Sequence, residues 1–516
     1  MLGDRHPWLK MSLLTGVLLG SIVPAGTAQP LDPTIPTGVA PVSPLFQSTP
    51  QTSLSESTDF QQVPLRLPQL IDLVLEGNRE LRDALLERIV QQQQLVEAES
   101  RFDPDITPRL SLAVTQRLED SENEFVREDR TTTDESARVT AETLTPIGTR
   151  LELAIDPLDD QPVELIVRQP LLRGFGERIN RAPITQARLT EQRNQLALQQ
   201  QTTETITQAI TSYTDLIQQQ EAVRIQEQAL ERRRDQNAII NALVQAGRRP
   251  RVDLVEADGN IANAERDLQN ARNQLAQANT NLLNLIGSDE PIQFVASLDE
   301  VARWFTAALE QVPSLKLTAL LETAYQQRPD YRRAQLATQV EQVSVDIAAD
   351  NQRWQLDAEG RATMGDDAEA RLGLVVTRPL GDERLETERR RSQVNLLQSE
   401  NELARVTTAI RNEVTTRLED VRSNQLRVEA ARRASEAAAL QLQGDREKFR
   451  RGRGGVTLLD LSQREEALVN AQNAQLEAEI AFLNSLTQLE QAVGITLITW
   501  ESQINFTPAL DVPTLP

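Results

Sequence analysis

The chain has 516 residues, with 76 Asp and Glu against 54 Lys and Arg and a formal net charge of −22. This charge argues against binding to nucleic acid or to anionic lipid, because both attract clustered Lys and Arg. The sequence contains no cysteine and a single histidine, His6. Thiol chemistry is therefore excluded, and the commonest general base and metal ligand is nearly absent. We expect neither an enzyme nor a bound cofactor or metal.

Residues 1–28 have the pattern of a secretory signal. Arg5 and Lys10 precede an apolar run over 11–23, and Gly26-Thr27-Ala28 supplies small residues for cleavage. The next stretch, 29–62, is rich in Pro, Ser, Thr and Gln, which predicts an extended linker. No apolar run of about 18 residues follows the signal, so strands are expected to carry any membrane insertion of this exported chain.

The remainder consists of two halves that match when one is shifted along the other. Leu65-Arg66-Leu67 matches Leu315-Lys316-Leu317, whereas Gly287 matches Gly494 at a smaller shift. The difference indicates a duplication with an insertion of about 41 residues in the first half, between Phe102 and Pro170. We predict repeat 1 at 63–287, an equatorial segment at 288–314, repeat 2 at 315–494 and a tail at 495–516.

Each repeat is predicted to contain a short helix, strands, a long helix and a second short helix. Apolar residues recur in the long helices at seven-residue steps, which indicates coiled-coil packing. A helix of about 70 residues spans roughly 105 Å, and two helices of about 36 residues placed end to end reach nearly the same length. The two arms of each hairpin should therefore match. The predicted helices are 66–101, 177–246 and 251–286 in repeat 1, and 316–352, 384–450 and 457–493 in repeat 2.

Alternating segments predict strands at about 104–168 and about 355–378. The charged stretch 119–135 is expected to be an extracellular loop. At least two strands per half give about four or more per chain, which cannot close a barrel alone, whereas three chains would supply twelve or more. The expected fold is mainly α, with duplicated long helical hairpins and a β portion that joins a trimeric twelve-stranded transmembrane β-barrel.

The ends of the long helices are the first candidate functional surface. Glycine permits a reversed backbone, so plain helical turns would explain these residues. The functional alternative is a docking tip, where missing side chains let a partner's helical hairpin approach and arginines supply charge complementarity. The residues concerned are Gly247, Arg248 and Arg249 in repeat 1, and Gly452, Arg453, Gly454 and Gly455 in repeat 2.

Three carboxylates, Asp253, Glu256 and Asp460, come directly after these tips. Acidic residues in a first helical turn stabilise the helix dipole by roughly 0.3–1 kcal/mol, which is a sufficient structural reason for them. Alternatively, a ring of such residues from several chains would narrow the mouth of a tunnel. Both interpretations stay open at this point.

In their order, duplication and spacing, these features resemble the TolC family of outer-membrane efflux proteins over about 63–495. The strand exits containing Pro170, Gly174, Pro379 and Gly381 are similar to that family's barrel-to-helix junctions. The resemblance also places a constriction carboxylate at Asp460. The first-half insertion and the Pro-rich leader depart from the family pattern.

The resemblance implies a homotrimer in the outer membrane, in contact with its lipid, with a helical tunnel in the periplasm. The tips would dock a periplasmic adaptor (membrane fusion) protein attached to an inner-membrane transporter. The implied function is a passive export conduit for efflux or type I secretion. The alternative is a periplasmic coiled-coil scaffold or adaptor without a barrel, which would explain the helices but not two strand segments that each end in Pro-Leu.

Overall fold

The computed structural model describes residues 61–119, 128–158, 163–365, 368–381, 383–451 and 455–501. The chain divides into two units, Met1–Thr58 and Asp59–Pro516, and all the described residues belong to the second. The expected signal at 1–28, nearly all of the linker, and most of the C-terminal tail lie outside the described residues. No helix in the described part is both long and apolar enough to cross a membrane.

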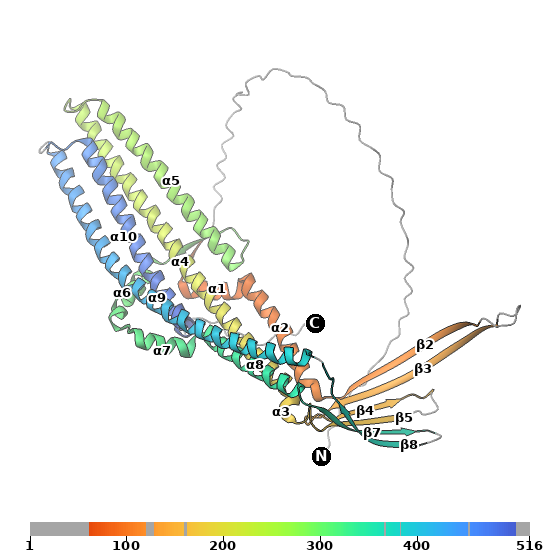
Figure 1. The fold of residues 1–516 in the computed structure, drawn as a ribbon. Helices are drawn as coiled ribbons and strands as arrows, with labels where there is room; N and C mark the ends of the chain where they lie inside the picture. The colour runs from red at the N-terminus through yellow and green to blue at the C-terminus, as the bar shows by residue number, and fades with distance from the viewer. Residues whose placement is uncertain are drawn as a thin grey trace, which may run out of the picture. The chain divides into compact units, whose positions relative to one another are not determined.

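The helices of the two halves correspond, except that the four-residue α3 of repeat 1 has no counterpart among the described helices of repeat 2. Repeat 1 contains α1 (Leu67–Gly77), α2 (Arg79–Glu99), α3 (Glu177–Asn180), α4 (Ala182–Gln245) and α5 (Val252–Ile286). Repeat 2 contains α7 (Leu317–Gln327), α8 (Pro329–Asn351), α9 (Arg384–Arg450) and α10 (Leu458–Val493). Figure 1 shows α4, α5, α9 and α10 packed side by side, with α2 and α8 continuing the shorter arms toward the strands.

Each first short helix, expected to be continuous, is broken in the middle. Asn78 is extended (ψ 123°), and its side chain caps α2 by accepting a hydrogen bond from the Leu81 N–H at 2.9 Å. Arg328 has the same ψ because it precedes Pro329, which disfavours helical backbone before it. Both residues then bind the second short helix of their repeat, Asn78 through the Leu285 carbonyl (3.1 Å) and Arg328 through the Ala492 carbonyl (2.8 Å). The duplication therefore extends to individual contacts.

Six of the described strands form an antiparallel sheet in the order β2-β3-β4-β5-β7-β8. The described residues contribute six strands, four of them from repeat 1, which is within the expected four or more per chain and above the figure of about four. The insertion therefore adds a hairpin, and the stretch 119–135 is not all loop, since β3 begins at Glu128. The strands are β2 (Asp105–Glu119), β3 (Glu128–Leu144), β4 (Arg150–Ile155), β5 (Val163–Pro170), β7 (Gln355–Met364) and β8 (Glu369–Thr377).

The equatorial segment contains a strand and a helix that the sequence analysis did not assign. Strand β6 (Ile292–Ala296) pairs in parallel with β1 (Gln61–Leu65) from the opposite end of repeat 1, and α6 (Leu298–Gln311) follows. Short 3₁₀ turns at Ser100–Phe102 and Val312–Ser314, and α11 (Thr496–Glu501), complete the described elements.

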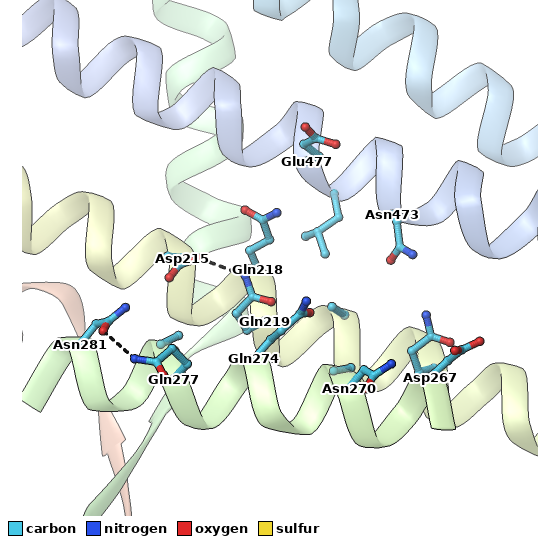
Figure 2. Close-up of a pocket in the computed structure, with 15 residues that line it drawn as sticks. Asp215, Gln218, Gln219, Asp267, Asn270, Gln274, Gln277, Asn281, Asn473 and Glu477 are labelled. Carbon is cyan, nitrogen blue, oxygen red and sulfur yellow. Dashed lines mark hydrogen bonds between the residues drawn. The ribbon is translucent and has the colours of Figure 1, made fainter. Parts of the chain in front are cut away.

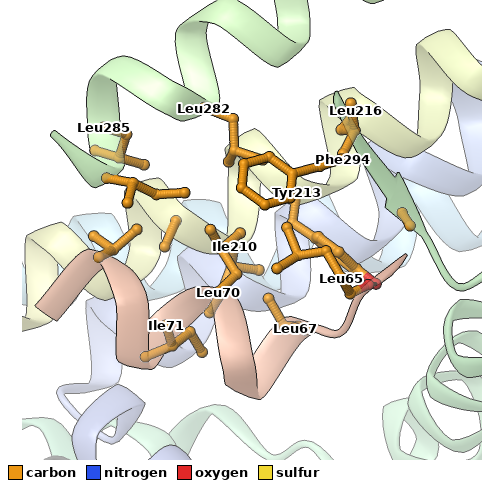
Figure 3. Packing of buried hydrophobic residues seen from close by; sticks show 14 of the residues in the cluster. Leu65, Leu67, Leu70, Ile71, Ile210, Tyr213, Leu216, Leu282, Leu285 and Phe294 are labelled. Atoms are coloured by element: carbon orange, nitrogen blue, oxygen red, sulfur yellow. Dashed lines mark hydrogen bonds between the residues drawn. The ribbon is translucent and has the colours of Figure 1, made fainter. Parts of the chain in front are cut away.

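Two apolar cores hold the helices around this segment. In the first, drawn in Figure 3, Tyr213 of α4 is fully buried and donates its hydroxyl to the Leu65 carbonyl at 3.1 Å. In the second, Phe305 of α6 meets Phe482 of α10 edge to face, with ring centroids 5.6 Å apart. Burial beside the cores raises the pKa of Glu490 to about 7, because a carboxylate loses hydration there.

Candidate functional site: the helical tips, the junctions and the sheet face

The turn between α4 and α5 is a tight glycine-centred reversal. Gly247 has φ +68°, and the space where its side chain would lie is open. The Gly247 N–H donates to the Val244 carbonyl at 3.0 Å, and the Arg248 N–H to the Leu243 carbonyl at 2.9 Å. These bonds satisfy the last carbonyls of α4. Gly247 therefore has the backbone conformation that a helical turn requires, and it is also exposed on the surface.

The turn between α9 and α10 lies beside the first one. Gly455 repeats the left-handed backbone (φ +66°) with open space around it, whereas Gly452, Arg453 and Gly454 lie outside the described residues. An apolar cluster that includes Ile240 of α4 and Phe449 of α9 holds the two ends together. Arg249 lies 4.7 Å above the Phe449 ring. In the turn between α4 and α5, Arg248 and Arg251 are both exposed, whereas Arg249 is half-buried.

Two of the three candidate aperture carboxylates have local partners. Asp253 lies 3.5 Å from Arg249. Asp460 forms a capping box with Thr457, accepting its N–H at 2.8 Å while the Asp460 N–H donates to the Thr457 hydroxyl at 3.1 Å. These hydrogen bonds hold the pKa of Asp460 below its ordinary value. Glu256 is exposed on the second turn of α5. Both acidic residues next to the tips therefore stabilise helix starts.

A buried ion cluster close to the tips was not predicted. Glu465 of α10 is 1% exposed. Its carboxylate accepts from Arg232 of α4 at 3.0 Å and also from Arg446 of α9. One acid therefore links both long helices to α10. The sequence signal is a charge on an apolar stripe, since Glu465 lies between the buried Leu461 and Leu468 at helical spacing.

A polar cavity of about 650 Å³ lies farther from the tips, between α4, α5 and α10 (Figure 2). Its lining is mainly amide and carboxylate, and neighbouring side chains bond to one another, as Gln219 does to Asp215 (3.0 Å) and Gln277 to Asn281 (3.1 Å). It includes Gln218 and Gln219 from the glutamine runs of the long helix. Such a wall suits water better than an apolar ligand.

The four junction residues lie where strands become helices. Pro170 is the last residue of β5, Pro379 follows β8, and Gly174 and Gly381 both have φ +77°. The Gly174 N–H donates to Asp350 of α8 at 2.7 Å, and the Gly174 carbonyl accepts from the Asn180 amide at 2.9 Å. The sequence analysis missed the contribution of Asp350, which is 3% exposed and ties the repeat 1 junction to repeat 2.

Gly148, in the turn between β3 and β4, was also missed. It has φ +98°, and a Cβ there would lie 2.4 Å from the Gly174 carbonyl oxygen and 2.8 Å from the Asn180 amide nitrogen. This turn therefore packs directly on the β5 junction. A loop glycine of this kind carries no periodic signal, so only the packed structure identifies it.

One face of the sheet is apolar across all six strands, and we call it the apolar face. Side chains directly opposite in an antiparallel register lie on the same side. The registers connect Ile106, Ala141, Leu153, Leu165, Ala362 and Ala370 in one apolar row across all six strands, while a few positions of this face are polar, such as Glu135 opposite Leu112. The face comprises Ile106, Pro108, Leu110, Leu112 and Val114 of β2, Ala137, Val139 and Ala141 of β3, Leu151, Leu153 and Ile155 of β4, Val163, Leu165 and Val167 of β5, Ala358, Gly360, Ala362 and Met364 of β7, and Ala370, Leu372, Leu374 and Val376 of β8.

The two faces of the sheet differ in chemistry and in exposure. On the apolar face Leu110 is 84% and Leu372 90% exposed. The other face carries cross-strand ion pairs, Arg168 with Glu359 at 2.6 Å and Arg361 with Glu164 at 3.3 Å. An exposed apolar surface of this extent indicates contact with lipid or protein.

Comparisons with known proteins agree with this arrangement. Residues 160–288 match the family model of the outer membrane efflux protein, and no curated protein sequence matches the chain. The fold is similar to that of CusC, a transmembrane channel (16% identity, 87% of this chain and 95% of that one, TM-score 0.63). It is also similar to the CmeC outer membrane channel of Campylobacter jejuni (13%, 85% and 89%, 0.61) and to the open state of the Neisseria gonorrhoeae MtrE outer membrane channel (17%, 83% and 89%, 0.59).

The two kinds of match cover different parts of the chain. The family model spans the last strand and helices of repeat 1, whereas the structural likeness extends over most of both repeats. The three solved structures named above are channels by their descriptions. The match to the outer membrane efflux protein family is thus to residues 160–288 of this chain, and the fold over most of the chain is that of the solved outer-membrane channels.

Proposed function

We propose that the chain is one subunit of a passive outer-membrane channel-tunnel, a homotrimer whose long helices form a duct through the periplasm. The observation that carries the proposal is the exposed apolar face of a sheet attached to paired long helical hairpins. Burying that face in lipid contributes about 25 cal/mol for each Å² of apolar surface removed from water. The charged opposite face would then line a water-filled lumen.

A periplasmic scaffold without a barrel accounts less well for these features. A soluble protein would leave residues such as Leu110, Leu374 and Val376, all at least 61% exposed, in contact with water. A conduit also gives a reason for the polar walls of the helical part, including the amide-rich cavity between α4, α5 and α10. We find no corresponding reason in a scaffold.

Within this function, we propose that Asp253, Glu256 and Asp460 of the three copies surround the tunnel mouth. Purified protein in planar bilayers should conduct and should prefer cations. The combined variant Asp253→Asn, Glu256→Gln and Asp460→Asn should lower the cation-to-anion permeability ratio several-fold, because nine carboxylates are removed from the mouth of a trimer.

A matched control removes carboxylates far from the tips. Glu80→Gln with Asp83→Asn, on α2, should leave the permeability ratio unchanged. Conductance with unaltered selectivity in the tip variant would reject the aperture role and keep the channel. Absence of conductance from intact wild-type protein in the bilayer would reject the channel itself.

We further propose that the tips dock a periplasmic adaptor attached to an inner-membrane transporter. The open space at Gly247 and Gly455 lets a partner helix approach the backbone, with Arg248 beside it. Gly247→Trp with Gly455→Trp should abolish export, measured as accumulation of a fluorescent efflux dye in cells that carry only the variant. Bulk at these positions blocks the approach, and no atom lies within 4 Å of the ideal Cβ position of either glycine.

The control for that experiment separates bulk from backbone strain. Gly247→Asn with Gly455→Asn keeps the left-handed turns, which asparagine tolerates better than most residues, and should retain export. Both double variants should reach the outer membrane in wild-type amounts. Export at the wild-type rate by the tryptophan variant would show that the tips are not the docking surface.

A further inference from the structure

The inserted hairpin of β2 and β3 continues the sheet in pattern as well as in pairing. Its apolar positions alternate with polar ones from Ile106 to Leu112, in phase with the apolar face of the other four strands. Its polar positions lie on the opposite, charged face of the sheet. There Arg138 of β3 lies 3.6 Å from Asp156, the residue that follows β4. An extracellular loop has no reason to keep this alternation over so many residues.

Each end of the sheet leaves one strand half-paired. Among the described residues β2 pairs with β3 alone, and β8 with β7 alone. Every residue of β8 is exposed, as is every residue of β2 from Asp105 to Val114. Edge strands present unpaired N–H and C=O groups, which lipid cannot satisfy. Both edges therefore need a partner strand.

A second copy of this chain fits both edges. All neighbours in the sheet are antiparallel, so the first and last of six strands run in opposite directions. The β8 edge of one copy can therefore pair antiparallel with the β2 edge of the next, and the operation repeats until a ring closes. Pro108 lacks one N–H donor, which costs at most one bond of that ladder.

We propose that β8 of each copy pairs with β2 of its neighbour, so that the inserted hairpin belongs to the membrane wall and each copy contributes all six strands. This inference rests on the proposed channel function. In a trimer the wall has eighteen strands, where four strands per chain would give twelve. The pairing must place the apolar residues of both edges on one side, so even-numbered residues of β2 face even-numbered residues of β8.

The chain contains no cysteine, which makes disulfide trapping a direct test. Leu374→Cys on β8 is combined in turn with cysteine at Ile106, Leu110 or Leu112 on β2, and with cysteine at Ser111 or Ala113 as opposite-face controls. After oxidation in outer membranes, at least one of the first three pairs should convert most of the protein to a covalent trimer on a non-reducing gel. The two controls and each single variant should stay monomeric on the same gel.

A second set of variants keeps the test decisive. Leu374→Cys with Leu151→Cys or Leu153→Cys places the partner on β4, which would meet β8 if the inserted hairpin lay outside the wall. Cross-linking through β4, or through none of the β2 positions, in a membrane-bound conducting trimer would overturn the six-strand pairing and leave the channel function standing. A chain that is monomeric or soluble would overturn both.

Discussion

Arg232→Met combined with Arg446→Met should be among the most destabilising changes outside the apolar cores, costing about 3–5 kcal/mol of unfolding free energy. Both arginines bind the carboxylate of Glu465, which is 1% exposed. Truncating them leaves a buried charge without a partner, while methionine keeps most of the apolar stem. The expected result is a lower midpoint for loss of the helical circular-dichroism signal on heating.

Two controls separate the buried charge from the loss of arginine as such. Adding Glu465→Leu to the double variant should restore most of the stability, because a packed apolar group can replace a buried ion cluster. Arg234→Met, on α4 like Arg232, breaks the ion pair between Arg234 and Glu265, whose two side chains are 60% and 52% exposed respectively. This change should lower the free energy of unfolding by less than about 1 kcal/mol. A double variant that melts with the wild type would contradict the argument.

Gly148→Ala should disrupt the strand-to-helix junction of repeat 1. The added Cβ would lie 2.4 Å from the carbonyl oxygen of Gly174, so the β3–β4 turn or the segment after β5 must move. The left-handed backbone adds about 1–3 kcal/mol of strain for a residue with a Cβ. We expect a several-fold lower yield of folded trimer in the outer membrane, measured as the heat-modifiable band on gels.

The comparison for this variant is Gly176→Ala. Gly176 has a similar positive φ (+102°), but nothing lies within 4 Å of its ideal Cβ position. This variant therefore shares the strain and lacks the clash, and its trimer yield should fall much less. Equal yields for the two variants would mean that close packing between the turn and the junction does not matter for assembly.

Local and periodic features were predictable from the sequence. The long helices, the duplication and the strand segments follow from the spacing of apolar residues along the chain. The glycine turns at Gly247 and Gly455 follow from the backbone freedom of glycine. The break at Pro329 was equally available, because proline restricts the residue before it, but the helix at 316–352 was predicted as continuous.

The features that were missed depend on residues distant in sequence. The β1–β6 pair joins residues about 230 positions apart, and such pairing leaves no local period. Glu465 gains its two arginines from α4 and α9 only after the hairpins pack. Asp350 and Gly148 matter because of contacts with the segment around Gly174. Charged stretches within the insertion favoured a loop, although two paired strands now account for much of it.

The sequence alone determined the classes of secondary-structure element and their duplication. It did so because the polar–apolar alternation, the helical period and the repeat are all properties of the order of residues. The tertiary structure decided which strands are neighbours, which charges are buried and which glycines have no room for a side chain. These depend on contacts between distant segments, and their energies exist only once the chain has brought those segments together.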